Sequence, residues 1–333
     1  PALIGPLLGP FLGGLIVHWA HWRVIFLMNL PFGLLGLWLS RSIMPDYRDE
    51  HVPPLDRLGF LLFGAGTALL SYVLEVFGEH SLPGGAVLGL LALSLALLAL
   101  YAAHSRRVRA PLLALGLFRL RTLRISVLGG LLTRLGVGGM PFLLPLLYQI
   151  GLGYAPWEAG LLTMPSAAAA IAMRVLNRRI LARFGHRQTL LVNTVLLGMT
   201  IAAFTQVSPD TPIGVIVLLG FAQGFFSSLQ FTSLNTLVVA DIDDRDASHA
   251  TTISSAGQQL SMSFGVAAAS LAVAAFLGPV NQKDPTQAIP ALHKAFAWMG
   301  GATLLSSLLF LLLRRTDGGN VSRFGAPSAA EGA

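Results

Sequence analysis

Long apolar runs separated by short polar segments dominate the chain. A helix needs about 20 apolar residues to cross the hydrocarbon core of a membrane. Ten runs approach or exceed that length, at 1–18, 23–44, 56–77, 84–104, 123–150, 157–180, 188–206, 212–240, 250–279 and 291–313. They are too long and continuous for the alternating strands of a membrane barrel. The pattern therefore predicts an all-α polytopic membrane protein with ten spanning helices.

The composition supports a membrane protein and excludes several other classes. Of the 333 residues, 54% are hydrophobic and 11% are charged, whereas a soluble globular chain carries about 25% charged residues. The net charge of +7 does not indicate a nucleic-acid partner, because the arginines lie in short loops between apolar runs. The absence of cysteine excludes disulfides, thiolate nucleophiles and cysteine metal sites.

The arginines and lysines predict the orientation. When loops are assigned alternately to the two sides, 18 of the 22 basic residues fall on one side and three on the other. Short cytoplasmic loops carry such an excess. We expect a multi-pass protein of the cell inner (plasma) membrane whose C-terminus is cytoplasmic.

The segments outside the runs also carry predictions. Residues 105–122 have the pattern of an amphipathic helix lying at the cytoplasmic membrane surface, with arginines toward headgroups and leucines inward. The basic stretch 174–187 is expected to extend the sixth run beyond the membrane. The tail after Arg315 is rich in Gly, Ser and Ala and is expected to be disordered. Because the chain begins at Pro1 inside an apolar run, we expect an N-terminal part to be missing.

Small residues form a motif in the first run. They are Gly5, Gly9, Pro10, Gly13 and Gly14. Glycines at this spacing let two helices approach closely, and proline bends a helix. The spacing alone is compatible with a generic packing face. The string also resembles the antiporter motif in the fifth helix of major facilitator superfamily exporters.

Other strings support that resemblance across about residues 1–315. WRVIFLMNLPFG (22–33) resembles the start of the sixth helix of the fourteen-helix drug:proton antiporters, and Asp56-x2-Gly59 with Leu74-Glu75 resembles the first of two extra central helices. GLGYAPWEAG (151–160), the polar run from Gln223 to Asn235 and QQLSMSFGVA (258–267) resemble multidrug-resistance exporters.

The resemblance implies a domain organisation and a truncated N-terminus. It places the last two helices of the N-terminal bundle at 1–45, two extra helices at 46–104, an amphipathic cytoplasmic linker at 105–122, the C-terminal six-helix bundle at 123–315 and a disordered cytoplasmic tail at 316–333. Ten of the fourteen helices are then present. The absent four would carry the family's main loop motif and a proton-linked aspartate.

One cytoplasmic loop departs from the family pattern. The pattern reads roughly G-x-L-A-D-R-x-G-R, and RRILARFGHR (178–187) replaces its glycine by Arg178 and its aspartate by Ala182. An aspartate-based charge relay is therefore in doubt in this half. The resemblance implies a cytoplasmic gate loop, formed by Arg178, Arg179, Arg183, Gly185 and Arg187. This basic cluster is also suited to carboxylates or lipid headgroups.

Arg134 is the most informative single residue. It lies about eleven residues into the fifth run, where a charge costs at least ~2.5–3.5 kcal/mol. Two interpretations remain open: a substrate or proton-coupling site, and a structural ion pair or a snorkelling arginine. Glu75 is one candidate partner, and the absent helices could supply another. Gly136, Gly138 and Gly139 with the following prolines predict a bendable span, either as a gate or as a structural kink.

Neutral polar residues recur inside the later runs. Such groups are costly on a lipid face, so they either line an aqueous cavity or bond neighbouring helices. Gln223, Ser227 and Gln230 share a helix face at i, i+4 and i+7, which makes them better cavity candidates than Ser228. The predicted substrate and coupling pathway comprises Arg134, Tyr148, Gln149, Gln223, Ser227, Gln230, Asn235 and Gln258.

The only acidic cluster lies in the loop DIDDRDASHA (241–250). We expect it to pair with the arginines of 174–187 or to be solvated. Metal binding is the alternative, although the loop lacks the calcium-loop pattern. The histidines show no metal-ligand spacing, and the sequence has no nucleophile elbow, phosphate loop or carboxylate dyad. We therefore expect neither an enzyme nor a metal site.

The resemblance implies a proton-coupled secondary transporter that exports drugs or other small amphiphilic compounds by alternating access. It would need no cofactor beyond the proton gradient. Expected partners are the small-molecule substrate, protons and membrane lipids, with periplasmic or outer-membrane efflux components as further candidates and no nucleic acid. Arg134 equally suits an exporter of an endogenous metabolite, organic acid or metal chelate. A non-transporting membrane receptor or scaffold is the alternative from a different class.

Overall fold

A computed structural model describes residues 4–44, 55–79, 84–108, 111–277 and 285–319. Every regular element in these ranges is helical, which confirms the predicted all-α fold. The helices are α1 (Ile4–Trp19), α2 (Arg23–Ile43), α3 (Arg57–Glu79), α4 (Gly84–Ser105), η1 (Leu115–Arg119), α5 (Arg121–Gly138), α6 (Met140–Leu146), η2 (Leu147–Gly151), α7 (Pro156–Ala203), η3 (Phe204–Gln206), α8 (Ile213–Val238), α9 (Asp244–Leu277) and α10 (Pro285–Phe310).

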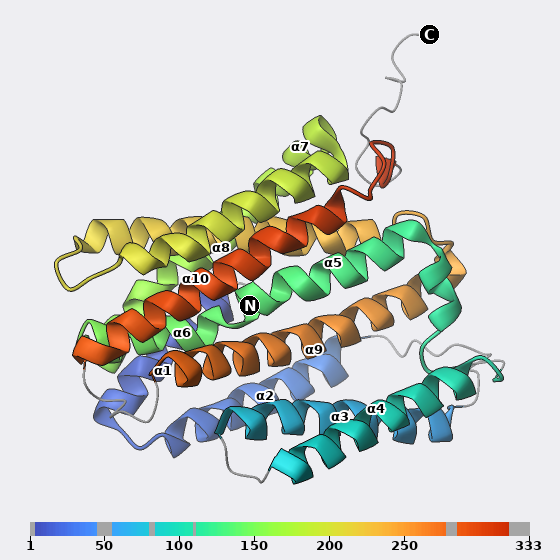
Figure 1. Ribbon diagram of the computed structural model, residues 1–333, viewed down its shortest axis with the longest axis horizontal. Helices are drawn as coiled ribbons and strands as arrows, with labels where there is room; N and C mark the ends of the chain where they lie inside the picture. Colours follow the sequence, from blue (N-terminus) through green and yellow to red (C-terminus); the bar gives the residue numbers. More distant parts are fainter. Residues whose placement is uncertain (1–3, 45–54, 80–83, 109–110, 278–284, 320–333) are drawn as a thin grey trace.

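The long helices run roughly side by side along one direction (Figure 1). Six described segments are long and apolar enough to cross a membrane, and Leu8–Trp19 and Arg57–Val73 are shorter apolar helices. The part of the predicted run 157–180 that precedes Val175 is in neither group. The predicted run 291–313, which corresponds to α10, does not meet the criterion either, although α10 is 26 residues long. Polar residues such as His293, Lys294 and Thr303 lower its hydropathy.

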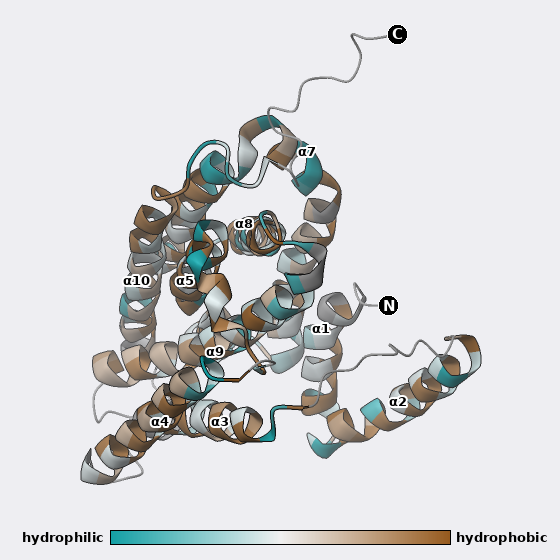
Figure 2. Cartoon of the chain, turned by 90° about the vertical axis from the view of Figure 1, so that its right-hand side faces the viewer, coloured by the Kyte–Doolittle hydropathy of each residue, from teal (hydrophilic) through white to brown (hydrophobic). Residues whose placement is uncertain are grey.

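A bundle of α5 to α10 holds the main core. Leu143, Leu147, Leu197, Phe204 and Phe296 are fully buried there. Glycines permit its close packing, since a Cβ on Gly138 would lie 3.0 Å from the Met262 carbonyl oxygen of α9. Viewed along the bundle, α1 lies beside it, α3 and α4 lie beneath α9, and α2 stands apart (Figure 2). No described residue of α2 is buried.

The sixth and seventh predicted runs form two helical stretches that are joined by a turn and share the label α7. Gly185 is the only residue of α7 with non-helical backbone angles, and its φ is 68°. That left-handed conformation strongly favours glycine, because it has no Cβ. The first half of α7 therefore extends to Phe184, which agrees with the predicted extension of the sixth run through 174–187.

The predicted amphipathic helix over 105–122 is wrong. Between the end of α4 at Ser105 and the start of α5 at Arg121, the only regular element among the described residues is the short 3-10 helix Leu115–Arg119. The leucines do not form a lipid-facing stripe, because Leu113 is buried and its neighbours pack against Tyr101, Leu123 and Val238. The Tyr101 hydroxyl accepts the Leu113 N–H at 2.7 Å, which fixes the irregular chain onto α4. Tertiary packing here overrides the helical pattern.

The predicted disorder of 316–333 is also wrong at its start. Residues 316–319 are ordered, and 320–333 lie outside the described residues. Asp317 accepts a hydrogen bond from Arg121 Nη2 at 2.6 Å and another from the Arg314 N–H at 2.9 Å. Its side chain is 8% exposed. This ion pair fastens the segment after α10 to the start of α5, a long-range contact that composition cannot reveal.

We expect Asp317→Asn to lower the free energy of unfolding by about 1–2 kcal/mol, because it leaves Arg121 without its counter-charge. The value is below that of a fully buried pair, since the Arg121 side chain is 32% exposed. Thermal unfolding in detergent measures the effect. The matched control is Asp210→Asn, at an exposed residue with no hydrogen bond to the described chain. Equal unfolding midpoints in the two variants would contradict the assignment.

Candidate substrate cavity

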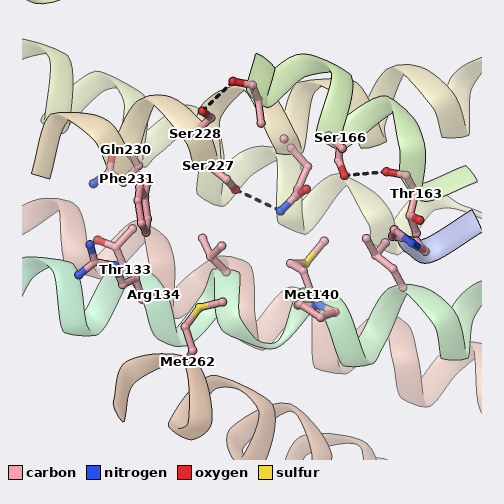
Figure 3. Close-up of a pocket in the computed structure, with 18 of the residues that line it drawn as sticks. Thr133, Arg134, Met140, Thr163, Ser166, Ser227, Ser228, Gln230, Phe231 and Met262 are labelled. Atoms are coloured by element: carbon pink, nitrogen blue, oxygen red, sulfur yellow. Dashed lines mark hydrogen bonds between the residues drawn. The ribbon is translucent and has the colours of Figure 1, made fainter. Parts of the chain in front are cut away.

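A cavity of about 700 Å³ lies between α5, α6, α7 and α8. Met262 of α9 and Pro10 of α1 complete its wall. Most of the lining is apolar, with polar side chains contributed by three helices, as the close-up shows (Figure 3). Its volume falls within the range of ligand pockets, about 300–1,000 Å³. A cavity with mostly apolar walls and few polar groups suits a small amphiphilic molecule.

Arg134 is the only charged residue in the lining of this cavity. It is 6% exposed, and neither Nε nor Nη2 has a hydrogen-bond partner among the described residues. Its guanidinium lies 5.4 Å from the centre of the Phe231 ring, a cation–π contact. The side chain of Glu75, a predicted partner, lies outside the described residues. A buried cation with free donors faces the cavity and favours a ligand that supplies acceptors or negative charge.

Three of the predicted pathway residues form the polar wall of α8. Gln223, Ser227 and Gln230 all line the cavity, at the predicted helical spacing. Gln223 Nε2 donates to Ser227 Oγ at 3.1 Å. Gln230 is more firmly held, because its Oε1 accepts from Asn193 Nδ2 at 2.8 Å and its Nε2 donates to Thr194 Oγ1 at 2.9 Å. Gln230 therefore bonds neighbouring helices as well as lining the cavity.

The other predicted pathway residues lie elsewhere. Tyr148 is fully buried in the main core, and its hydroxyl has no partner among the described residues. Gln149 is exposed, and Asn235 and Gln258 are half-buried outside the cavity lining. Tyr148 and Gln149 belong to the π-helical segment η2, to which a regular 3.6-residue period does not apply.

Sequence reasoning missed a second group of polar lining residues. Thr133, Thr163 and Ser166 line the cavity, as does Ser228, which the helical spacing ranked too low. Ser228 Oγ donates to the Ala170 carbonyl oxygen at 3.3 Å, and Ser166 Oγ to that of Thr163 at 2.7 Å. A Cβ on Gly224 would lie 2.6 Å from the Ser166 carbonyl carbon, so α7 and α8 approach closely. The Gly220-x3-Gly224 spacing was the available signal.

The small-residue motif of α1 contacts α7 through only part of its length. A Cβ on Gly14 would lie 2.9 Å from the Pro156 carbonyl carbon, and one on Gly160 would lie 2.9 Å from that of Pro10. In contrast, a Cβ on Gly5, Gly9 or Gly13 would meet no described atom within 4 Å. Gly14 and Pro10 thus form a backbone-to-backbone seam with the start of α7.

The predicted gate loop is centred on the turn of α7. Arg178, Arg179 and Arg183 are exposed, Arg187 is half-buried and Gly185 supplies the turn. Among the described side chains, no salt bridge joins these arginines to Asp241, Asp243 or Asp246. The expected pairing of the acidic loop is therefore not seen there. In the same described ranges, no group of three or more His, Asp or Glu residues is placed to hold a metal.

Comparison with known proteins adds independent information. The sequence model of the Major Facilitator Superfamily matches residues 2–266 and 127–328. A putative multidrug resistance protein MdtD of Serratia proteamaculans (strain 568) is 36% identical over 298 residues, which are 90% of this chain and 61% of that protein. The protein of the same name in Escherichia coli O157:H7 (strain EC4115 / EHEC) is 37% identical over 314 residues, which are 94% of this chain and 66% of that protein. The chain thus spans less than two thirds of the length of these relatives.

Proposed function

The chain belongs to the major facilitator superfamily, a family of multi-pass membrane transporters, and we propose that the protein containing it exports small amphiphilic compounds, drugs among them. The observation that carries this proposal is the 700 Å³ cavity, apolar on most of its surface and polar along α8, with Arg134 in its wall. Relatives named as putative multidrug resistance proteins support the substrate class.

The mechanism we propose is alternating access coupled to inward proton flow. The cavity lies between helices, where transporters of this kind bind their substrates. The backbone seam between α1 and α7 would let the two halves rock against each other. The arginine-rich loops and the C-terminus are assigned to the same side of the membrane, which supports a cytoplasmic C-terminus.

Export of an organic anion is a second candidate, and Arg134 is the observation that favours it. A lipophilic cation would gain from Phe231 and the other apolar walls but would be repelled by Arg134. An anionic metabolite, organic acid or metal chelate would instead supply the acceptors that Arg134 Nε and Nη2 lack among the described residues.

A transport assay separates these candidates. The full-length protein is reconstituted in proteoliposomes with an imposed pH gradient and supplied with lipophilic cations, neutral amphiphiles and organic anions in turn. We expect gradient-dependent movement of at least one class, abolished by a protonophore. Movement confined to anions would favour the second candidate. If no class moves although the protein is folded, the non-transporting receptor or scaffold becomes the better explanation.

A further inference from the structure

A second hollow lies outside the substrate cavity, beside the turn of α7. Its volume is about 410 Å³, and its lining comprises Phe184, Arg187, Gln188, Leu191 and Arg315. The two arginines come from segments far apart in the sequence, the second half of α7 and the chain after α10. Neither forms a salt bridge with any described residue, and Arg187 Nε is buried without a hydrogen-bond partner there. The hollow therefore presents cationic donors that the described residues leave unsatisfied.

An apolar groove adjoins this basic hollow. It has a volume of about 200 Å³ between α7 and α8, and Phe184 and Gln188 belong to both linings. The rest of its wall includes Val192, Leu196 and Leu229. Val192 and Leu196 are 46% and 39% exposed, so the groove opens on the outer surface of the bundle. That surface faces lipid in a protein of this class.

The combined length of the basic hollow and the apolar groove matches the thickness of one leaflet of a membrane. Leu196 lies nine residues after Arg187 on the same helix, which corresponds to about 13–14 Å at the rise of an α-helix. Half of the hydrocarbon core is about 15 Å. A molecule with its charged end at Arg187 would therefore extend its apolar chain to about the middle of the membrane.

From this arrangement we propose that the arginine hollow and the adjoining groove form a binding site for one anionic phospholipid. The phosphate accepts hydrogen bonds from Arg187 and Arg315, and an acyl chain lies along the groove. The choice of an anionic lipid rests on charge complementarity, because two arginines that form no salt bridge with a described residue meet the end of an apolar channel. The leaflet is the one that carries the arginine-rich loops.

The groove and the substrate cavity share a wall. Asn193 lines the groove, and its Nδ2 donates to Gln230 Oε1, whose side chain lines the cavity. The proposed lipid site is nevertheless independent of what the cavity transports, because none of its charged residues belongs to the cavity lining.

Lipid binding to the purified full-length protein tests the proposal. Phosphatidylglycerol is titrated and bound lipid is counted by native mass spectrometry, with phosphatidylcholine and inorganic phosphate as separate probes. We expect Arg187→Gln with Arg315→Gln to weaken phosphatidylglycerol binding about thirtyfold. Arg106→Gln with Arg107→Gln is the matched control, because it removes the same charge from exposed residues of the same predicted face and should leave binding unchanged.

A separate variant tests the apolar groove. Val192→Trp adds bulk inside the groove at an exposed position and should weaken phosphatidylglycerol binding without affecting the arginines. If the Arg187 variant does not fold, Arg315→Gln alone, at an exposed residue, should still weaken binding several-fold. Three results would overturn the proposal: equal binding by the arginine variant and its control, phosphatidylcholine binding as tight as phosphatidylglycerol, or displacement of the lipid by millimolar inorganic phosphate.

Discussion

Arg134→Ala should lower substrate transport at least about thirtyfold while leaving the protein folded. Arg134 is the only charged residue in the described lining of the cavity, and two of its donors have no partner among the described residues, which leaves a contact for the ligand to complete. Losing one partner of a desolvated charged contact costs about 2–5 kcal/mol, which corresponds to a fall of about thirtyfold to several thousandfold in substrate affinity or transport rate. Arg134→Lys keeps the charge and should retain part of the activity. Proteoliposome transport and direct substrate binding measure the effect.

The control for this variant lies on the same helix. Arg124→Ala removes an exposed arginine of α5 outside the cavity and should transport normally. If Arg134→Ala also transports every substrate at the normal rate, Arg134 is a structural residue and the site assignment is wrong. If it loses anions but gains lipophilic cations, the cavity is a site for anions and the second candidate function holds.

Adding bulk to the seam between α1 and α7 should have the other large effect. In Gly160→Val the new side chain would meet the carbonyl group of Pro10, and in Gly14→Val it would meet that of Pro156. Because backbone cannot move aside as a flexible side chain does, we expect each substitution to cost about 1–3 kcal/mol and to force the helices apart. Transport should fall at least tenfold in both variants, and the thermal unfolding midpoint should fall as well.

A glycine in open surroundings gives the matched comparison. A Cβ on Gly301 of α10 would meet no described atom within 4 Å, so Gly301→Val should unfold at the normal temperature and transport normally. The seam assignment is contradicted if Gly14→Val and Gly160→Val behave like Gly301→Val in both measurements.

Sequence reasoning succeeded where one periodic signal determines the structure. The apolar runs predict helices because a spanning segment must satisfy its backbone internally. Gln223, Ser227 and Gln230 meet at the cavity because side chains three or four residues apart lie on the same face of a helix. Arg134 could also be identified from the sequence as a functional candidate, because an arginine in an apolar run must find a polar environment.

Sequence reasoning failed where contacts between residues far apart in the chain determine the structure. The leucines of 105–122 pack against Tyr101 and Val238 instead of lipid, and Asp317 is ordered by Arg121. Tyr148, a predicted pathway residue, is buried in the main core and not in the cavity lining. Thr163 and Ser166, which were not predicted, line the cavity where Gly224 lets α7 approach α8. Apart from the approach of α7 to α8, which the Gly220-x3-Gly224 spacing signals, these features are not visible in the spacing of residues along one segment.

Photoaffinity labelling with a transported compound tests the central claim most directly, because it locates the bound molecule in the full-length protein. The label is mapped by mass spectrometry of peptides, and an excess of unlabelled compound serves as competitor. The account predicts competed labelling within 133–145, 163–170 or 223–234, the stretches of α5 to α8 that line the cavity, and loss of that labelling in Arg134→Ala. Competed labelling found only at residues outside these stretches and away from Pro10 and Met262, which complete the cavity wall, would contradict it.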